Sequence, residues 1–357
     1  MNPIEKIGIG RTDLRVTRLG FGAVPLGGLY KDVSEDEAGA TVRRTLELGI
    51  NYFDTAPIYG FGKSEIRLGR ELARRNRDSL VIATKVGYTL VPEDGGSDSK
   101  VFHRFANVPP LRPIFDYSYD GIMKTFEGSL QRLNLTRVDI LNIHDPDYHW
   151  EEAIKITYPT LHKLRSEGVV RAIGVGMTQA EMLARFAREG DFDCLLLAGR
   201  YTLIDHTGLR ELLPICEQRG ISVIVGGPYN SGILATGARP GATYDYVEAS
   251  PAVMERVAAL ETVCGRHNVP LKAAALQFPM AHPAVAAIIP GARLATEVEE
   301  NFRLLSMVIP DDFWEELRHL SLLPPEAPTP RLGQTARRSA LRCEEPGRDH
   351  DRREQTR

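Results

Sequence analysis

The 357-residue sequence has only four cysteines, Cys194, Cys216, Cys264 and Cys343, and they form neither a CxxC motif nor another paired spacing. This excludes a disulfide framework and a zinc site built on cysteine, and it favours a reducing compartment, so we expect a cytoplasmic protein. An excess of charge of one sign is missing too, since 44 Lys and Arg face 47 Asp and Glu. A net charge of −3 gives no basic field for nucleic acid or an anionic membrane, so the expected partners are small molecules.

Long apolar runs are also absent. The longest, residues 194–198 and 285–290, are far shorter than the roughly 20 residues that a membrane-spanning helix needs. The N-terminal stretch MNPIEKIGIGRT has no apolar signal core. We therefore expect no membrane association, and 43% hydrophobic with 25% charged residues is the composition of a folded globular protein.

Eight short apolar runs predict strands that are buried on both faces, as in a parallel sheet. They span residues 19–22, 51–55, 80–86, 138–144, 171–175, 194–198, 222–225 and 284–289. Helical spacing predicts helices at 34–48, 63–74, 119–133, 151–167, 179–189, 208–219, 253–267 and 297–305, and the first begins with a capping-box pattern at Ser34. The alternation predicts a (β/α)8 barrel with a short N-terminal hairpin. An open doubly wound sheet is the alternative, but no GxGxxG motif follows any of these runs.

Two segments lie outside this repeat. Residues 88–117 follow the third predicted strand and are expected to form a long loop at the C-terminal rim of the barrel, where substrates usually bind. Residues 1–323 then form the barrel, and residues 324–357 form a charged tail. Because the last 27 residues hold eight Arg, five acidic residues and no aromatic residue, we expect this tail to be disordered and solvated.

Polar residues stand where consecutive predicted strands end, which is where catalytic groups lie in such barrels. Asp54 ends the second strand and Tyr59 follows five residues later, while Lys85 and His144 end the third and fourth strands. A Lys in an apolar strand needs an anion, and Asp54 is its natural partner. The Lys85 ammonium would lower the pKa of a nearby Tyr59 phenol, which predicts an acid/base device. Taken singly, the four could instead be a helix cap, a loop anchor, a rim residue and a satisfied core imidazole.

These four residues carry a resemblance to the aldo-keto reductase superfamily over about residues 4–320. The motifs are NYFDTAPIYGFGKSEIRLG around Asp54 and Tyr59, IATK ending at Lys85, and His144 followed by Asp145. The resemblance implies that Tyr59 is the general acid/base, that Lys85 tunes it, and that Asp54 pairs with Lys85. It further implies that His144 orients the substrate oxygen and that no metal takes part.

Four longer segments resemble bacterial D-threo-aldose 1-dehydrogenases, also called L-fucose dehydrogenases, and the related pyridoxal 4-dehydrogenases. They are HDPDYHW (144–150), AGRYTLID (198–205), GGPYNSGILATG (226–237) and VPLKAAALQFPMAHPAVAAIIPGAR (269–293). Both groups oxidise a ring hemiacetal carbon to a lactone, so the expected substrate is an aldose of the L-fucose, D-arabinose or L-galactose type, with pyridoxal as the alternative. An NADPH-dependent reductase of aldehydes or ketones is a further alternative.

Two alternatives come from other functional classes. The first is a cofactor-binding regulatory subunit similar to the potassium-channel β subunits, which share the expected fold. The intact set of Asp54, Tyr59, Lys85 and His144 argues against this alternative. A metal-dependent barrel hydrolase would need paired metal ligands, and the sequence has no HxH or HExxH motif. The oligomeric state cannot be predicted from the sequence.

The resemblance also implies a nicotinamide dinucleotide extended across the barrel top, with its adenosine end on segment 288–302. There Glu297 stands where many NADP-using members place a basic residue. A carboxylate repels a 2′-phosphate and can accept a hydrogen bond from a free ribose hydroxyl, so NAD is expected, while Arg293 keeps NADP possible. The expected contacts in this segment are Pro290, Gly291, Ala292, Arg293, Glu297, Glu300 and Asn301.

The residues expected near the nicotinamide and pyrophosphate depart from the superfamily pattern. Gly176 and Met177 replace a Ser-Asn pair, and Ala198 replaces a common Gln. Arg200 and Tyr201 are candidates to replace the missing contacts. The expected contacts after the seventh strand are Gly226, Gly227, Pro228, Tyr229 and Gly232. Gly226 stands where a stacking aromatic residue is usual, and the backbone at the three glycines would let a pyrophosphate approach closely. Trp150 and Phe115 are candidates for an apolar wall of the substrate site.

Overall fold

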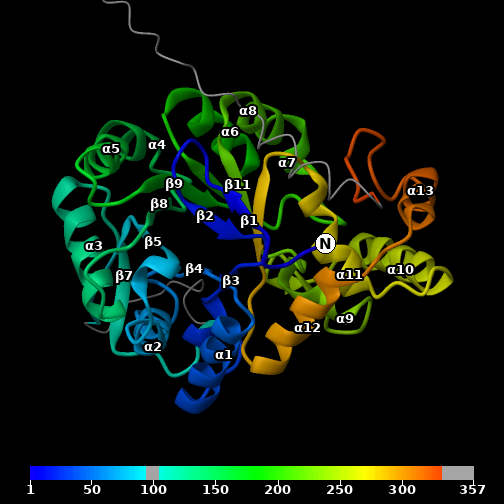
Figure 1. Ribbon diagram of the computed structural model, residues 1–357, viewed down its shortest axis with the longest axis horizontal. Helices are drawn as coiled ribbons and strands as arrows, with labels where there is room; N and C mark the ends of the chain where they lie inside the picture. Colours follow the sequence, from blue (N-terminus) through cyan, green and yellow to red (C-terminus); the bar gives the residue numbers. More distant parts are fainter. Residues whose placement is uncertain (94–103, 332–357) are drawn as a thin grey trace, which may run out of the picture.

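The computed structural model describes residues 1–93 and 104–331, and a barrel of eight parallel strands lies at its centre (Figure 1). In spatial order the strands are β3 (Phe21–Gly22), β4 (Tyr52–Asp54), β5 (Val81–Val86), β8 (Ile140–His144), β9 (Ala172–Met177), β10 (Cys194–Ala198), β11 (Ser222–Gly226) and β14 (Val285–Ile289). Bridges from Leu19 to Ile288 and from Gly22 to Gly291 join the first strand to the last. All eight predicted strands and the predicted (β/α)8 barrel are confirmed.

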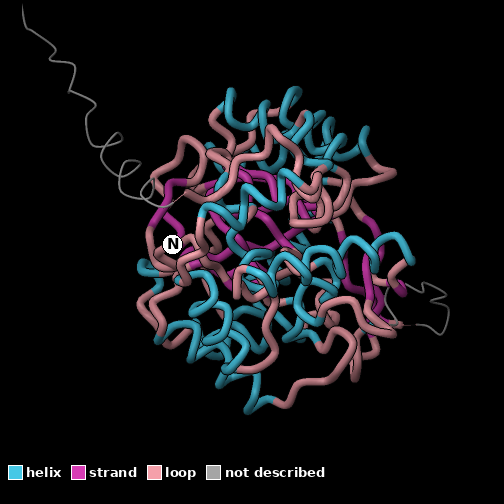
Figure 2. Tube along the Cα trace, turned by 90° about the vertical axis from the view of Figure 1, so that its right-hand side faces the viewer, coloured by secondary structure: helices cyan, strands magenta, loops and turns pink. Residues whose placement is uncertain are grey.

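Helices surround the strands on the outside (Figure 2). The main helices are α1 (Glu35–Glu47), α2 (Lys63–Leu72), α3 (Tyr119–Leu133), α5 (Tyr158–Ser166), α6 (Ala180–Glu189), α8 (Leu212–Arg219), α10 (Pro251–Arg266), α11 (Leu271–Gln277), α12 (Ala295–Ser306) and α13 (Asp311–His319). Short helices are α4 (Trp150–Glu152), α7 (Thr207–Arg210) and α9 (Ile233–Thr236), and a π-helical segment (Ala153–Thr157) joins α4 to α5. The capping box at Ser34 is confirmed, because its hydroxyl accepts from the Glu37 N–H and the Glu37 carboxylate accepts from the Ser34 N–H. In the described ranges, no helix combines the length and the apolar character needed to cross a membrane.

The helix predicted over residues 208–219 is broken into α7 and α8. The break lies at Glu211, whose backbone angles are φ −123° and ψ −48°. Pro214 is three residues beyond the break and has no N–H to donate to the carbonyl of Arg210, and its ring would also clash with that carbonyl. The apolar periodicity continues through this point, but the backbone hydrogen bonds cannot.

The long loop predicted over residues 88–117 is wrong at both of its ends. Strand β6 (Tyr88–Pro92) pairs antiparallel with β7 (Leu111–Phe115), so that Tyr88 lies opposite Phe115. Both strands contain the aromatic and aliphatic side chains that suit a half-buried ribbon, and cross-strand pairs such as this one stabilise it. Residues 94–103, at the centre of the predicted loop, lie outside the described residues.

The predicted short N-terminal hairpin is confirmed, because β1 (Lys6–Gly8) pairs antiparallel with β2 (Arg15–Thr17), and it closes one end of the barrel. Its side chains Ile9, Leu14 and Val16 are buried in one apolar cluster with the barrel-lining residues. The carboxyl ends of the strands lie at the other end, and the polar residues of the site are therefore carried there.

The predicted tail begins within a segment that packs on α13. Arg318 donates to the carbonyl of Ala327 and to the hydroxyl of Thr329, and both of these residues are buried. The disorder predicted for residues 324–357 is therefore wrong for residues 324–331, because these contacts order them. The remainder of the predicted tail, residues 332–357, lies outside the described residues.

Candidate active site

Lys85 and Asp54 form a buried ion pair at the carboxyl ends of the neighbouring strands β5 and β4. The Lys85 ammonium donates to Asp54 Oδ1 at 2.5 Å and to the Thr55 carbonyl at 2.8 Å. The two side chains are only 1% and 3% exposed. Burial raises the pKa of Asp54, while the charge of Lys85 acts in the opposite direction. The second carboxylate oxygen, Oδ2, is buried and has no hydrogen-bond partner in the described part of the chain.

Tyr59 lies beside this pair on the loop between β4 and α2. The Lys85 ammonium is 4.8 Å from the centre of the Tyr59 ring. The loop is held by a close backbone contact, because a Cβ atom on Gly60 would lie 2.3 Å from the carbonyl oxygen of Gly27. Gly60 also has a φ of +62°, a conformation that glycine adopts at little cost. These two glycines fix the position of the phenol relative to Lys85.

The acidity of Tyr59 corrects the sequence-based expectation. Burial raises the pKa of the phenol well above its usual value, and the carboxylates of Asp54 and Asp145 raise it further. The positive charge of Lys85 does not reverse this shift, because Asp54 neutralises it at 2.5 Å. The expected net lowering of the Tyr59 pKa is therefore wrong, although the nearby cation on its own favours the phenolate, and the phenol is protonated at neutral pH.

His144, at the end of β8, completes the group. Its ring packs edge-on against Tyr59 with 5.7 Å between centroids. Burial lowers the pKa of His144 well below its usual value, and the nearby Lys85 lowers it further, so the imidazole is neutral. Its Nδ1 atom is buried without a partner within the described residues. A neutral imidazole can donate from one nitrogen and accept at the other, as a hydroxyl-bearing substrate requires.

Aromatic side chains border His144 on the side of the β6–β7 ribbon. Tyr88 packs edge-on against the imidazole at 5.5 Å, and Phe115 lies 4.4 Å from Tyr88. Phe115 is thus part of an aromatic wall beside the site, as the sequence suggests. Trp150 is not, because it is buried against Phe186, with 4.4 Å between ring centroids.

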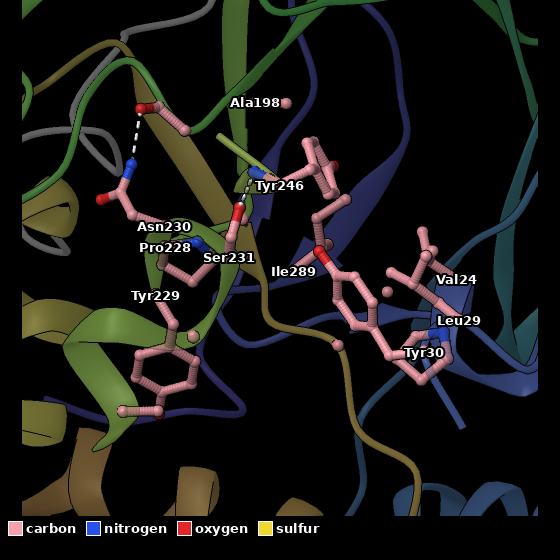
Figure 3. A pocket seen from close by; sticks show the side chains of 18 of the residues that line it. Val24, Leu29, Tyr30, Ala198, Pro228, Tyr229, Asn230, Ser231, Tyr246 and Ile289 are labelled. Atoms are coloured by element: carbon pink, nitrogen blue, oxygen red, sulfur yellow. Dashed lines mark hydrogen bonds between the residues drawn. The ribbon is translucent and has the colours of Figure 1, made fainter. Parts of the chain in front are cut away.

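A single cavity of about 510 Å³ extends from Asp54 and Tyr59 to the start of α12 (Figure 3). The expected contacts that line it are Ala198, Gly226, Gly227, Pro228, Tyr229, Gly232, Gly291, Arg293, Glu297, Glu300 and Asn301. At its far end Glu297 accepts a hydrogen bond from the Arg293 N–H at 2.7 Å, and the Arg293 guanidinium lies 3.7 Å from the same carboxylate. Tyr229 donates to Asn301 Oδ1 at 2.6 Å.

Other expected contacts do not line this cavity. Met177 is 1% exposed and packs in the core between sheet and helices, because alternation along β9 turns it away from the barrel interior that Gly176 faces. Gly176 lies against the Lys85 side chain instead. Tyr201 is buried against Phe278. Pro290 and Ala292 have structural positions instead: the Pro290 carbonyl accepts a hydrogen bond from the Gly22 N–H, and Ala292 is buried in the core.

Arg200 has a structural role that the sequence did not suggest. Its guanidinium binds both carboxylate oxygens of Asp245, at 2.9 and 2.7 Å, and also donates to Asp205 and to the Tyr244 hydroxyl. It thereby holds the small hairpin of β12 (Thr243–Tyr244) and β13 (Val247–Glu248) against the loop after β10. The prediction that Arg200 contacts the cofactor is not supported by its position.

Two tyrosines that the sequence analysis missed lie across the cavity. Tyr246, at the turn of the β12–β13 hairpin, and Tyr30, on the loop before α1, are 6.5 Å apart between ring centroids (Figure 3). Both have positive φ and stand in turns, where no strand or helix periodicity indicates which way a side chain points. Only the tertiary arrangement brings these distant segments together.

Comparisons with known proteins agree with this geometry. The Aldo/keto reductase family model matches residues 18–321. A pyridoxal 4-dehydrogenase of Microbacterium luteolum is 37% identical over 89% of this chain and 98% of that protein. A D-threo-aldose 1-dehydrogenase of a Pseudomonas species is 36% identical over 87% and 96% of the two chains. Among solved structures, the holo form of an aldo-keto reductase from Bacillus halodurans is similar at a TM-score of 0.70 and 25% identity, covering 93% of this chain and 99% of that one.

Proposed function

The chain belongs to the aldo/keto reductase family and is an NAD(P)-dependent oxidoreductase, and from this we propose that it oxidises the hemiacetal carbon C1 of an aldose to the lactone, with NAD as cofactor. The observation that carries the proposal is the meeting of the Lys85–Asp54 pair, Tyr59 and His144 beside one end of a single cavity. Similarity to an aldose 1-dehydrogenase supports the substrate class, and sugars of the L-fucose, D-arabinose or L-galactose type are the expected substrates. A cytoplasmic location stays a prediction from the cysteine pattern.

The residues of the cavity fit a nicotinamide dinucleotide. The cavity begins at Tyr59, and its wall includes Gly226 and Gly227, which leave room for close backbone approach, while a Cβ on Gly232 would meet no atom within 4 Å. At the other end Arg293 and Asn301 offer polar groups to a ribose or phosphate. When bound, the oxidised nicotinamide accepts the hydride that leaves C1 of the sugar.

The far end of the cavity favours NAD over NADP. The Glu297 carboxylate lies on the cavity wall and is already paired with the backbone and side chain of Arg293. A 2′-phosphate placed there would face this carboxylate and would compete with it for the guanidinium. A free ribose hydroxyl could donate a hydrogen bond to the same carboxylate.

In the proposed reaction the chain's own groups handle the proton. Tyr59, as the phenolate, takes the proton from the C1 hydroxyl, and neutral His144 binds the same oxygen and fixes the reacting carbon in place. The C1–H bond breaks with its electron pair, the O–H bond releases its proton to the phenolate, and C1–O becomes the lactone carbonyl. Lys85 stabilises the phenolate from 4.8 Å, and Asp54 holds Lys85 in position.

Oxidation of pyridoxal is the second candidate, because the pyridoxal 4-dehydrogenase is as similar as the aldose enzyme. Initial NADH formation at mildly alkaline pH with L-fucose, D-arabinose, L-galactose and pyridoxal, each repeated with NADP⁺, separates the two. We expect turnover of an aldose with NAD⁺. Turnover of pyridoxal alone, or NADPH consumption with simple aldehydes alone, would overturn the proposal.

The role of Tyr59 is tested by the Tyr59→Phe variant, which keeps the ring and removes the hydroxyl. We expect kcat to fall by at least about 100-fold, the lower range for a general acid/base. NADH binding, followed by fluorescence, should not change, which shows that the cavity is intact. A variant that keeps wild-type turnover would refute the role.

A further inference from the structure

Asp145 follows His144 directly and occupies an unusual backbone conformation. Its φ of +43° lies in the left-handed region that residues other than glycine, asparagine and aspartate seldom adopt. The Asp145 N–H donates to the Gly176 carbonyl at 3.0 Å, and the Tyr117 hydroxyl donates to the Asp145 carbonyl at 3.2 Å. The chain turns back on itself at this residue, and one carboxylate oxygen, Oδ2, lies 3.7 Å from Nε2 of His144.

The Asp145 carboxylate lies beside His144, one of the reacting groups. Its charge contributes to the raised pKa of Tyr59, Tyr88 and Tyr246, which come from three different segments of the chain. The side chain is 37% exposed, and among the described residues no backbone or side-chain group donates a hydrogen bond of normal length to its carboxylate. A carboxylate that lies among the catalytic groups without a donor of its own is available to a ligand.

The charge state of Asp145 is compatible with this role under alkaline assay conditions. The part of the side chain that is buried loses solvation, which raises the pKa of Asp145 to about 7; the neighbouring Asp147 raises it as well, and Lys85 acts against both. Above pH 8 the group is therefore an anion that can only accept hydrogen bonds.

We propose that Asp145 is a specificity-determining residue, which accepts a hydrogen bond from the hydroxyl on the ring carbon next to the reacting carbon of an aldose. This inference rests on the proposed function. His144 binds the oxygen on C1, and the hydroxyl on C2 is the neighbouring polar group of the ring, so it meets the carboxylate beside His144 Nε2. A substrate that lacks this hydroxyl leaves the carboxylate without a donor, which a site built for a hydroxyl penalises strongly.

The test compares kcat/KM for L-fucose and 2-deoxy-L-fucose with NAD⁺ at pH 9. We expect the wild-type enzyme to prefer L-fucose by about 10- to 100-fold, the range that a hydrogen bond to a charged group supplies. In Asp145→Gly, which removes the carboxylate and adopts positive φ freely, the preference should fall to about threefold or less. Asp145→Asn keeps the size and tolerates the same backbone conformation, and we expect its preference to fall at least about threefold, since the acceptor is no longer charged.

Asp147→Asn is the matched control, because it removes a neighbouring carboxylate that does not lie beside His144, and its preference should equal that of the wild type. Circular dichroism confirms that each variant is folded, and if Asp145→Gly does not fold, Asp145→Asn decides the question. Equal use of both sugars by the wild type, or an unchanged preference in the folded variants, overturns the role of Asp145 and leaves aldose oxidation standing. If the wild type oxidises no aldose, the proposed function fails, and this inference fails with it.

Discussion

Replacing Lys85 with Met removes the cation that pairs with Asp54 and keeps most of the volume of the side chain. The Asp54 carboxylate then lies buried with no partner for its charge, because Lys85 is the donor to its Oδ1 atom and its Oδ2 atom already has none in the described structure. Removing one partner of a buried ion pair costs about 3–5 kcal/mol. The Thr55 carbonyl loses its Lys85 donor as well, which adds about 1 kcal/mol.

We therefore expect the Lys85→Met variant to be about 5 kcal/mol less stable than the wild type at pH 8, as measured by urea unfolding followed by circular dichroism. The deficit should shrink at lower pH. Loss of Lys85 raises the pKa of Asp54 in the folded protein still further. A carboxyl group with a raised pKa in the folded state destabilises the fold only when it is ionised, so the loss of stability develops as the pH rises from the pKa of the unfolded chain, about 3.9, to the pKa of the folded protein.

The double variant Lys85→Met/Asp54→Asn isolates the charge. An amide in place of the carboxylate removes the unpaired charge, so the double variant should recover at least about 2 kcal/mol relative to Lys85→Met alone. A single variant as stable as the wild type, or a double variant no more stable than the single one, would refute the account of this pair.

Three further predictions concern the proton, the loop before α1 and the β12–β13 hairpin. Because burial raises the pKa of Tyr59 well above its usual value and the phenolate is the base, the rate of aldose oxidation should rise from pH 7 to pH 10; a plateau reached below pH 8 in initial rates would speak against it. Arg67→Met should lower the stability to urea by about 3 kcal/mol and weaken NADH binding, because the buried guanidinium donates to the carbonyls of the loop that carries Tyr30; unchanged stability would contradict this. Arg200→Gln should speed NADH dissociation about tenfold in stopped-flow fluorescence, because it frees the hairpin at Asp245, while the free energy of unfolding stays within about 1 kcal/mol of the wild type. A dissociation rate equal to that of the wild type would show that the hairpin does not cover the cofactor.

The strands of the barrel could be predicted because each is buried on both faces and therefore appears in the sequence as a continuous apolar run. The helix at Ser34 could be predicted from local capping chemistry alone. The β6–β7 ribbon could not, because residues 93–110 separate its two strands and no short turn motif indicates that they pair. The break at Glu211 depends on one proline, whose effect on the backbone the apolar periodicity does not record.

Some features of the candidate site could likewise be predicted from the sequence, and others could not. Asp54, Lys85 and His144 stand at strand ends, so the order of strands in a barrel is enough to bring them together. The side-chain direction of Met177 follows from alternation along β9 and was open to prediction, but the Arg200 contacts depend on a hairpin that has no sequence signal. The pKa of Tyr59 could not be predicted, because it depends on whether burial or the nearby cation dominates, and only the three-dimensional positions decide that.

The most direct test of the central claim uses L-fucose carrying deuterium at C1, with NAD⁺ and the full-length enzyme at mildly alkaline pH. Nuclear magnetic resonance follows the label and identifies the sugar product. We predict that deuterium appears at C4 of the reduced nicotinamide and that the sugar is recovered first as its lactone. Reduced cofactor without deuterium, or no reduction of NAD⁺ by this sugar, D-arabinose or L-galactose, would contradict the proposed oxidation at C1.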